Sequence, residues 1–417
     1  MSKRRVVITG LGTVNPLGNS VPAFWEGMLA GRSGVTRVTK LDASQYDSQI
    51  AGEVKDFPGI PEAYVSKREA RRLDPFAEYA VAAAVEAVID SGLDFQKEDR
   101  LKCGVVVGSG IGGLQELETQ HERLMAKGPS KVSAFTIPKL MVNAAAGNIS
   151  ILWQLQGPSV ATVTACASAG HAMADALRYV QSGMCDIVLT GGSEAAVTKI
   201  GLASFCALKG LSTRNDDPAT ASRPWDEGRD GFVMADGAGI VVLEEFEHAR
   251  ARGAAIYGEL LGAGSSGDGY HITAPQPDGA GAALAMQRAL KDAGIEPGQV
   301  GYINAHGTST QLGDIAETKA VKAVFGDHAY KGLMISSTKS FIGHSLGASG
   351  GIEMVAVAKA IREGVIPQTL NLQTPGQECD LDYVPREPRA AKVNVAMSNS
   401  FGFGGHNISL VVRRFAD

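Results

Sequence analysis

The segment TVTACASAGHAM, residues 162–173, places Cys166 among small residues at the junction between two predicted elements. A β-branched stretch, Val160 to Thr164, precedes the cysteine, and apolar residues at helical spacing follow it as far as Gly183. This pattern predicts a strand that turns sharply into a helix, with the cysteine at the corner. A helix N-terminus favours the thiolate, and the backbone N–H groups there can face a developing oxyanion. Cys166 is therefore a candidate nucleophile, although a buried structural cysteine is the common alternative.

Two histidines occupy similar positions later in the chain. NAHGTST contains His306 and STKSFIGHSLGASGG contains His344, each after a predicted strand and among small residues. Imidazoles near a thiol can act as acid–base groups or as N–H donors to a negatively charged oxygen. Metal ligation and a purely structural role are the alternatives. No HExxH or CxxC pattern accompanies the two histidines, so we expect no metal site.

The sequence GSGIGG, residues 108–113, completes a G-x-G-x-x-G pattern after a predicted strand. In dinucleotide-binding proteins such a unit continues to a further strand that ends in an acidic residue about 20 positions on. Here the chain continues instead as HERLMAKGPSKVSAFTIP. We therefore expect neither a nicotinamide nor a flavin site.

Composition excludes several classes of protein. The 417 residues are 44% hydrophobic and carry a formal net charge of −5, which argues against a general nucleic-acid binder. No apolar run approaches the roughly 20 residues that span a bilayer, and the basic start reads as a first strand rather than a signal peptide. Five scattered cysteines predict reduced thiols and a cytoplasmic location.

Two pairs of segments share one plan. Residues 79–113 and 281–310 each read as an alanine-rich helix, a polar loop, a buried strand and a loop of small residues. Residues 162–183 and 334–364 each read as a strand, a small-residue loop and a helix closed by glycine. Two correspondences in the same order indicate a duplicated unit. We expect an α/β fold of mainly parallel, helix-covered sheets, with the catalytic groups at strand ends between the halves.

Four motifs in order, TACASAG, NAHGTST, STKS…GH and SNSFGFGG, resemble those of the β-ketoacyl-acyl-carrier-protein synthases of the thiolase superfamily. The similarity extends from Arg5 to Phe415, and the closest likeness is to the elongating type II enzymes of fatty-acid synthesis. The resemblance implies a five-layered α-β-α-β-α fold and a homodimer. The two halves would be residues 1–255, which carry the nucleophile, and residues 256–417, which carry the catalytic histidines.

The resemblance also implies roles for individual residues. Cys166 matches the nucleophile, His306 and His344 the two histidines, Lys339 the neighbouring lysine, and Glu353 its partner. The backbone N–H groups of Cys166 and Phe403 match the oxyanion hole. Positions that match the acyl pocket or the pantetheine tunnel are Ile111, Phe205, Thr308 and Thr310. Phe401 and Phe403 alternate with glycines, so this segment is either a glycine-rich hairpin or a mobile aromatic gate that binds substrate. His406 is either a third catalytic histidine or, as we expect, structural.

A basic segment, SKREARR at residues 66–72, places like charges at helical i,i+4 spacing in an acidic chain. It is either a solvated face or a docking site for an acidic partner, and the resemblance favours docking of acyl carrier protein. The positions that match the docking region are Lys67, Arg68, Arg71, Lys127, Lys209 and Arg214.

The function that this resemblance implies is a decarboxylative condensation of malonyl-carrier protein with an acyl chain held on Cys166, which lengthens the chain by two carbons. No cofactor is expected beyond the phosphopantetheine of the carrier. The alternatives are a specialised polyketide ketosynthase, a non-catalytic partner subunit, and a cysteine hydrolase. Hydrolase chemistry is disfavoured because TACASAG lacks the flanking signature of papain-like proteases.

Overall fold

The computed structural model describes residues 3–415, and ten strands of that range form one sheet. Its two outermost strands are β5 and β10, and its middle is a short antiparallel contact between β1 and β8 in which only Val7 and Ile8 pair. In order across the sheet the strands are β10 (Met334–Ser336), β9 (Tyr302–Asn304), β13 (Val395–Gly402), β14 (His406–Arg414), β8 (Gly258–Gly267), β1 (Val6–Val14), β7 (Gly237–Glu245), β6 (Ile187–Glu194), β4 (Cys103–Gly108) and β5 (Ser159–Thr162).

The duplication is visible in the order and direction of these strands. Numbered within its own half, each group of five has the spatial order 3-2-4-5-1. In each group the second strand pairs in parallel with the third and the fourth, and the fifth is antiparallel to the fourth and the first. Four strands of each half therefore run in one direction, as expected of mainly parallel sheets, and only β7 and β14 run against them. Strands buried on both faces are apolar whichever way they run, so their composition did not reveal the antiparallel pairs.

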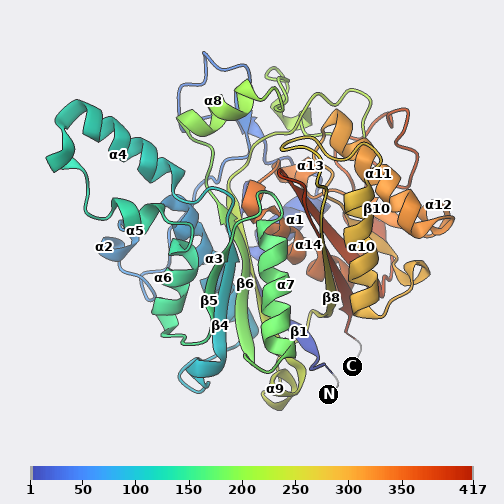
Figure 1. The fold of residues 1–417 in the computed structure, drawn as a ribbon, viewed down its shortest axis with the longest axis horizontal. Coiled ribbons are helices and arrows are strands. Elements are labelled where there is room, and N and C mark those ends of the chain that lie inside the picture. Colours follow the sequence, from blue (N-terminus) through green and yellow to red (C-terminus); the bar gives the residue numbers. More distant parts are fainter. Residues whose placement is uncertain (1–2, 416–417) are drawn as a thin grey trace.

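Helices cover both halves of the sheet and fill the space between them. α3 and α6 pack on the outer face of the first half, α7 and α14 lie between the halves, and α10 packs on the outer face of the second half beside α11 (Figure 1). This is the five-layered α-β-α-β-α arrangement. The α-helices are α1 (Val21–Leu29), α2 (Lys67–Ala70), α3 (Pro75–Ser91), α4 (Leu114–Lys127), α5 (Thr136–Leu140), α6 (Ala144–Trp153), α7 (Ser168–Gln181), α8 (Lys199–Ala207), α9 (Phe246–Ala251), α10 (Ala280–Ala293), α11 (Gln311–Phe325), α12 (His328–Lys331), α13 (Lys339–Ile342) and α14 (Ser349–Glu363).

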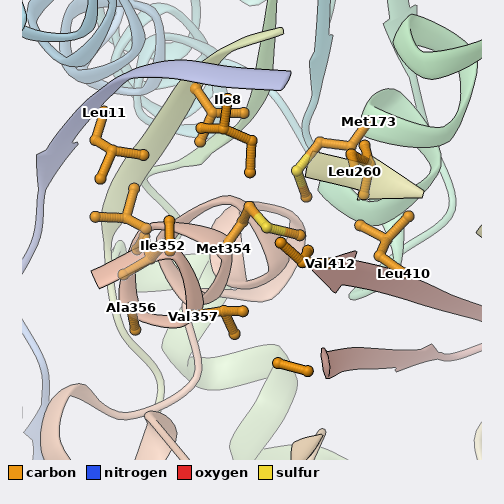
Figure 2. Close-up of a cluster of buried hydrophobic side chains, with 14 of the residues drawn as sticks. Ile8, Leu11, Met173, Leu260, Ile352, Met354, Ala356, Val357, Leu410 and Val412 are labelled. Carbon is orange, nitrogen blue, oxygen red and sulfur yellow. The ribbon is translucent and has the colours of Figure 1, made fainter. Parts of the chain in front are cut away.

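The middle layer contains the core that joins the two halves. Figure 2 shows Met173 of α7 and Met354 of α14 among side chains of β1, β8 and β14, including Ile8, Leu260 and Leu410. All five side chains are at most 2% exposed. Because strands of both halves contribute to this one cluster, the halves pack as a single body.

Glycines let α14 approach the sheet of the first half very closely. A Cβ on Gly239 of β7 would lie 2.2 Å from the backbone nitrogen of Ile352, and a Cβ on Gly351 would lie 2.2 Å from the carbonyl oxygen of Gly239. No side chain larger than hydrogen fits at that separation. The N-terminus of α14 is therefore fixed against β7, and the segment that precedes α14 lies beside the first half.

Across residues 3–415, no helix has both the length and the apolar character that a membrane span requires.

Candidate active site

Cys166 lies in a tight turn between β5 and α7. The preceding residue, Ala165, has φ +50°, which costs a non-glycine residue about 1–2 kcal/mol. The Ser168 hydroxyl closes the turn, since its oxygen accepts from the backbone N–H of Thr164 at 2.9 Å and donates to the carbonyl of Ala165 at 2.6 Å. The sequence therefore located the corner correctly, and the turn places the cysteine directly before the helix.

A single cavity of about 470 Å³ reaches Cys166 from the surface, and both halves line it. The cysteine is 7% exposed and lies at the buried end. Sequence reasoning selected ten residues that the structure brings together around this cavity: Ile111, Cys166, Phe205, Lys209, His306, Thr308, Thr310, His344, Phe401 and Phe403.

The two histidines stand edge to face, with ring centroids 5.3 Å apart and ring planes at 86°. Phe401 packs beside His306 and Phe232 beside His344, so aromatic rings flank the pair on both sides. Nδ1 of His344 is 2.9 Å from the hydroxyl of Ser349. If that hydroxyl donates, the ring carries its proton on Nε2.

Both imidazoles are neutral at pH 7. Burial lowers the pKa of His306 and of His344 well below the usual value, and the positive charge of Lys339 lowers both further. Nδ1 of His306 is buried and has no hydrogen-bond partner among residues 3–415. An unsatisfied buried nitrogen costs about 1–3 kcal/mol, so a ligand that bonded this ring would recover that energy. Neutral imidazoles are suited to donate N–H groups to an anionic oxygen.

Lys339 does not line the cavity but lies behind the histidines. It is 1% exposed, and its Nζ is 2.5 Å from Oε1 of Glu353, which is equally buried. The other oxygen of Glu353 has no partner within the described range. The lysine therefore acts on the cavity through its charge, which also lowers the pKa of the Cys166 thiol.

The protonation of Cys166 differs from the expectation. Burial raises the pKa of its thiol to about 12, although the charge of Lys339 and the backbone N–H groups of Phe403 and Cys166 act in the opposite direction. The helix N-terminus thus does not outweigh desolvation, and the resting group is a neutral thiol. The sequence shows where a helix begins but not how deeply its first turn is buried. This is why the expected direction of the pKa shift at Cys166 was wrong.

The β13–β14 hairpin packs over Cys166. Its glycine-rich turn follows Gly402, where a Cβ would lie 2.6 Å from the carbonyl of Thr164 and 3.1 Å from the nitrogen of Cys166. This close packing brings the N–H of Phe403 near the thiol. The Phe403 side chain is 37% exposed at the cavity. His406 begins β14, is exposed and does not line the cavity.

The candidate docking residues are spread over the surface. Lys209 lines the cavity and pairs with Asp47 at 2.6 Å, whereas the others lie away from the cavity lining. α2 extends only over Lys67–Ala70, so Arg71 lies beyond the helix that the charge spacing predicted. A Ser66–Glu69 capping box starts the helix. Lys127 ends α4, and Arg214 donates to the carbonyl of Gly228 at 2.9 Å.

Sequence reasoning missed the carboxylates that hold the His306 loop. Glu317 of α11 accepts from the backbone N–H groups of His306 at 2.9 Å and Gly307 at 2.8 Å. Asp314, one turn earlier, accepts from the N–H of Thr308 at 3.1 Å. The sequence did contain a signal for this contact: the helix that follows the small-residue loop carries two acidic residues three positions apart, which lie on one face of the helix.

Comparison with known proteins identifies the family. Residues 3–249 match the family described as "Beta-ketoacyl synthase, N-terminal domain", and residues 257–373 match "Beta-ketoacyl synthase, C-terminal domain". The chain therefore belongs to the β-ketoacyl synthase family.

Full-length relatives agree with this assignment. The chain is 49% identical over 417 residues to a 3-oxoacyl-[acyl-carrier-protein] synthase 2 of Vibrio harveyi, with all of both chains covered. It is 50% identical to the protein of the same name from Staphylococcus aureus, with 99% of each chain covered. A solved ketosynthase of a type II polyketide system, in complex with its acyl-carrier protein, is 34% identical with a TM-score of 0.91 over 99% of this chain and all of that one.

We predict a simple pH dependence for the resting nucleophile. Because burial raises the pKa of the Cys166 thiol, its alkylation by iodoacetamide should accelerate continuously from pH 7 to pH 9.5, about tenfold per unit. The measurement is the rate of carbamidomethyl incorporation at Cys166 by peptide mass spectrometry. A rate that levels off below pH 8 would reveal a resting thiolate and contradict this assignment.

Proposed function

We propose that this β-ketoacyl synthase elongates fatty acyl chains on an acyl carrier protein by decarboxylative condensation with malonyl-carrier, through an acyl chain held on Cys166. The observation that carries the proposal is the convergence of Cys166, His306 and His344, from two halves of the chain, on one cavity, where Cys166 and His344 are buried. Relatives that match over their full length at about 50% identity are named as synthases of this kind.

Acyl transfer comes first. The thiol of Cys166 attacks the thioester carbonyl of acyl-carrier, the new carbon–sulfur bond forms, and the bond to the pantetheine sulfur breaks. The Cys166 sulfur loses its proton as it attacks, and that proton ends on the departing pantetheine thiol, so the overall exchange is neutral in charge. The charge of Lys339 and the backbone N–H groups of Phe403 and Cys166 favour this loss of the proton. The backbone N–H groups of Cys166 and Phe403 are placed to bind the oxyanion, and Thr308 and Thr310 to line the pantetheine arm.

Condensation follows in the same cavity. Malonyl-carrier loses carbon dioxide, and the electron pair that remains forms an enolate on its thioester. Neutral N–H donors from His306 and His344 stabilise the enolate oxygen, each worth on the order of 3 kcal/mol of barrier. The enolate carbon attacks the acyl carbonyl on Cys166, the carbon–sulfur bond breaks, and the cysteine takes up a proton. Lys339 polarises the site and is not the base. Phosphopantetheine on the carrier is the only cofactor that this scheme uses.

The acyl carrier protein is the proposed partner. One of the solved structures similar to this chain is a ketosynthase in complex with its acyl-carrier protein. Basic side chains on α2, α4 and the loops near the cavity suit an acidic carrier, and Lys209 at the cavity itself would meet its phosphopantetheine arm. We infer a cytoplasmic location, where the five free cysteines of the described chain stay reduced.

A homodimer is the proposed assembly. β5 is an edge strand of the sheet, half-exposed along its length; α6 packs against it, and α5 lies next to α6 (Figure 1). Exposed apolar side chains gather on these neighbouring elements and the residue after β5: Ile137, Met141, Ile151 and Val163. A second copy that pairs its own β5 with this edge would cover both the unpaired backbone and the apolar side chains.

The alternatives are separated by specific features. A non-catalytic partner subunit has no need of the intact Cys-His-His arrangement. A specialised polyketide ketosynthase would use the same geometry, but the polyketide ketosynthase compared above is 34% identical, against about 50% for the fatty-acid relatives. A papain-like hydrolase does not share this duplicated five-layered fold.

Replacement of one histidine should separate the two half-reactions. With His344→Ala, transfer of a labelled acyl group to Cys166 should continue, whereas release of carbon dioxide from malonyl-carrier should fall by about 10²- to 10³-fold because one enolate donor is lost. The two readouts are protein-bound acyl label and labelled carbon dioxide. Equal loss of both, or loss of neither, would contradict the assigned role.

Charge reversal on α2 tests the docking surface. Lys67→Glu with Arg68→Glu should raise KM for acyl-carrier by about tenfold at low salt, because two favourable contacts become unfavourable, and should leave KM for an acyl-pantetheine unchanged. Lys97→Glu with Arg250→Glu is the matched control, since both are exposed cations that do not line the cavity. An unchanged KM in the α2 variant would show that this segment is a solvated face and not a docking site.

A further inference from the structure

The glycine-rich segment Ser109–Gly112 binds the carboxylate of a glutamate from the same chain. Glu194, the last residue of β6, accepts hydrogen bonds from the backbone N–H groups of Gly110 at 2.6 Å, Ile111 at 3.1 Å and Gly112 at 3.3 Å. It also accepts from the hydroxyl of Ser109 at 2.8 Å. The G-x-G-x-x-G pattern thus surrounds a carboxylate with N–H groups in the way that related loops surround a phosphate.

The same carboxylate reaches a second segment. Its Oε2 accepts from the N–H of Gly347 at 3.1 Å, in the short 3₁₀ turn Leu346–Ala348 that follows His344. Five donors therefore converge on one side chain that is 0% exposed. An ionised carboxylate is a pure acceptor and satisfies all five, whereas a protonated one would place its own hydrogen among donors.

Glycine is required on both sides of this contact. A Cβ on Gly110 would lie 2.9 Å from Oε2 of Glu194, and a Cβ on Gly347 would lie 2.7 Å from the same oxygen and 2.3 Å from the nitrogen of Gly110. The two segments thus touch each other as well as the carboxylate. Among residues 3–415 no salt bridge reaches Glu194. Burial raises the pKa of its carboxyl group, and the Ser109 hydroxyl and the backbone N–H groups act in the opposite direction by stabilising the charged form.

We propose that Glu194 is a positioning residue: its carboxylate fixes Ile111 and the segment after His344 against each other at the wall of the cavity. This inference rests on the proposed function in that Ile111 borders the acyl chain. The bond network sets how far the Ile111 side chain reaches toward Cys166, and therefore how long an acyl chain the cavity accepts.

Glu194 also acts on the nucleophile through its charge. The carboxylate lies near enough to Cys166 to raise the pKa of the thiol, a smaller effect than burial but of the same sign. Removal of this charge should therefore make the thiol more acidic. A residue that merely filled space in the core would have no such effect.

Glu194→Gln is the informative change. In either orientation of the amide, its NH₂ group faces at least two backbone N–H donors, those of Ile111 and Gly112 or those of Gly110 and Gly347. The segments must separate, and we expect kcat/KM for acyl transfer to fall by about 10- to 100-fold. The ratio of rates for long and short acyl-carriers should change as well, because Ile111 moves.

The second readout does not involve substrate. The alkylation profile of Cys166 with iodoacetamide should shift to lower pH in Glu194→Gln, so that the reaction at pH 8 becomes about two- to threefold faster. Glu194→Asp keeps the charge but is one methylene too short to reach every donor. It should show the acyl-transfer defect without the shift in alkylation.

Glu53→Gln is the matched control. Glu53 is a 1% exposed carboxylate that accepts from the backbone N–H groups of Thr39 and Lys40, and it does not line the cavity. It should change neither the chain-length ratio nor the alkylation profile. If Glu194→Gln fails to fold, Ser109→Ala removes a single donor and should reduce acyl transfer several-fold in the same chain-length pattern.

An unshifted alkylation profile together with an unchanged chain-length ratio in a folded Glu194→Gln protein would overturn the proposal. Failure of the proposed function would give a different result from failure of this inference. The wild-type protein would then transfer no acyl group, but Glu194→Gln would still shift the alkylation profile of Cys166.

Discussion

The close contact between α14 and the first half of the sheet is the constraint on which the site depends. Cys166 lies two residues before α7, and His344 lies five residues before α14. These two helices share the middle layer, so Cys166 and His344 meet only if the two helices keep a fixed position relative to each other. Gly239 and Gly351 permit that position because they have no side chain that would separate α14 from β7. Larger residues at these positions would separate the two halves of the active site.

Burial of this shared layer also determines the charges of the site. It keeps Cys166 as a thiol and both histidines neutral, while Lys339 and Glu353 stay paired behind them. A cavity with neutral N–H donors is suited to hold an enolate, whose charge appears only during the reaction. The elements that carry these donors are each fixed by a carboxylate, Glu317 under the His306 loop and Glu194 beside the segment after His344.

The sequence predicted the repeat and the residues around Cys166 because both depend on local pattern. The two predicted alanine-rich helices are α3 and α10, which are closed by Gly92 and Gly294 in the left-handed conformation. The direction of β7 and β14 was not predictable, because strands buried on both faces carry no sign of their orientation. The acidity of the thiol and the role of Glu194 depend on distant segments that only the folded chain brings together.

Acyl transfer to Cys166 is the most direct test of the account. Intact-protein mass spectrometry after incubation with acyl-carrier should show one acyl group added to the wild-type chain and none added to Cys166→Ala. Addition of malonyl-carrier should then remove that mass and yield a 3-oxoacyl product two carbons longer. A wild-type chain that gains no acyl mass, or one whose acyl mass persists after malonyl-carrier is added, would contradict the central claim that Cys166, His306 and His344 work on a common substrate.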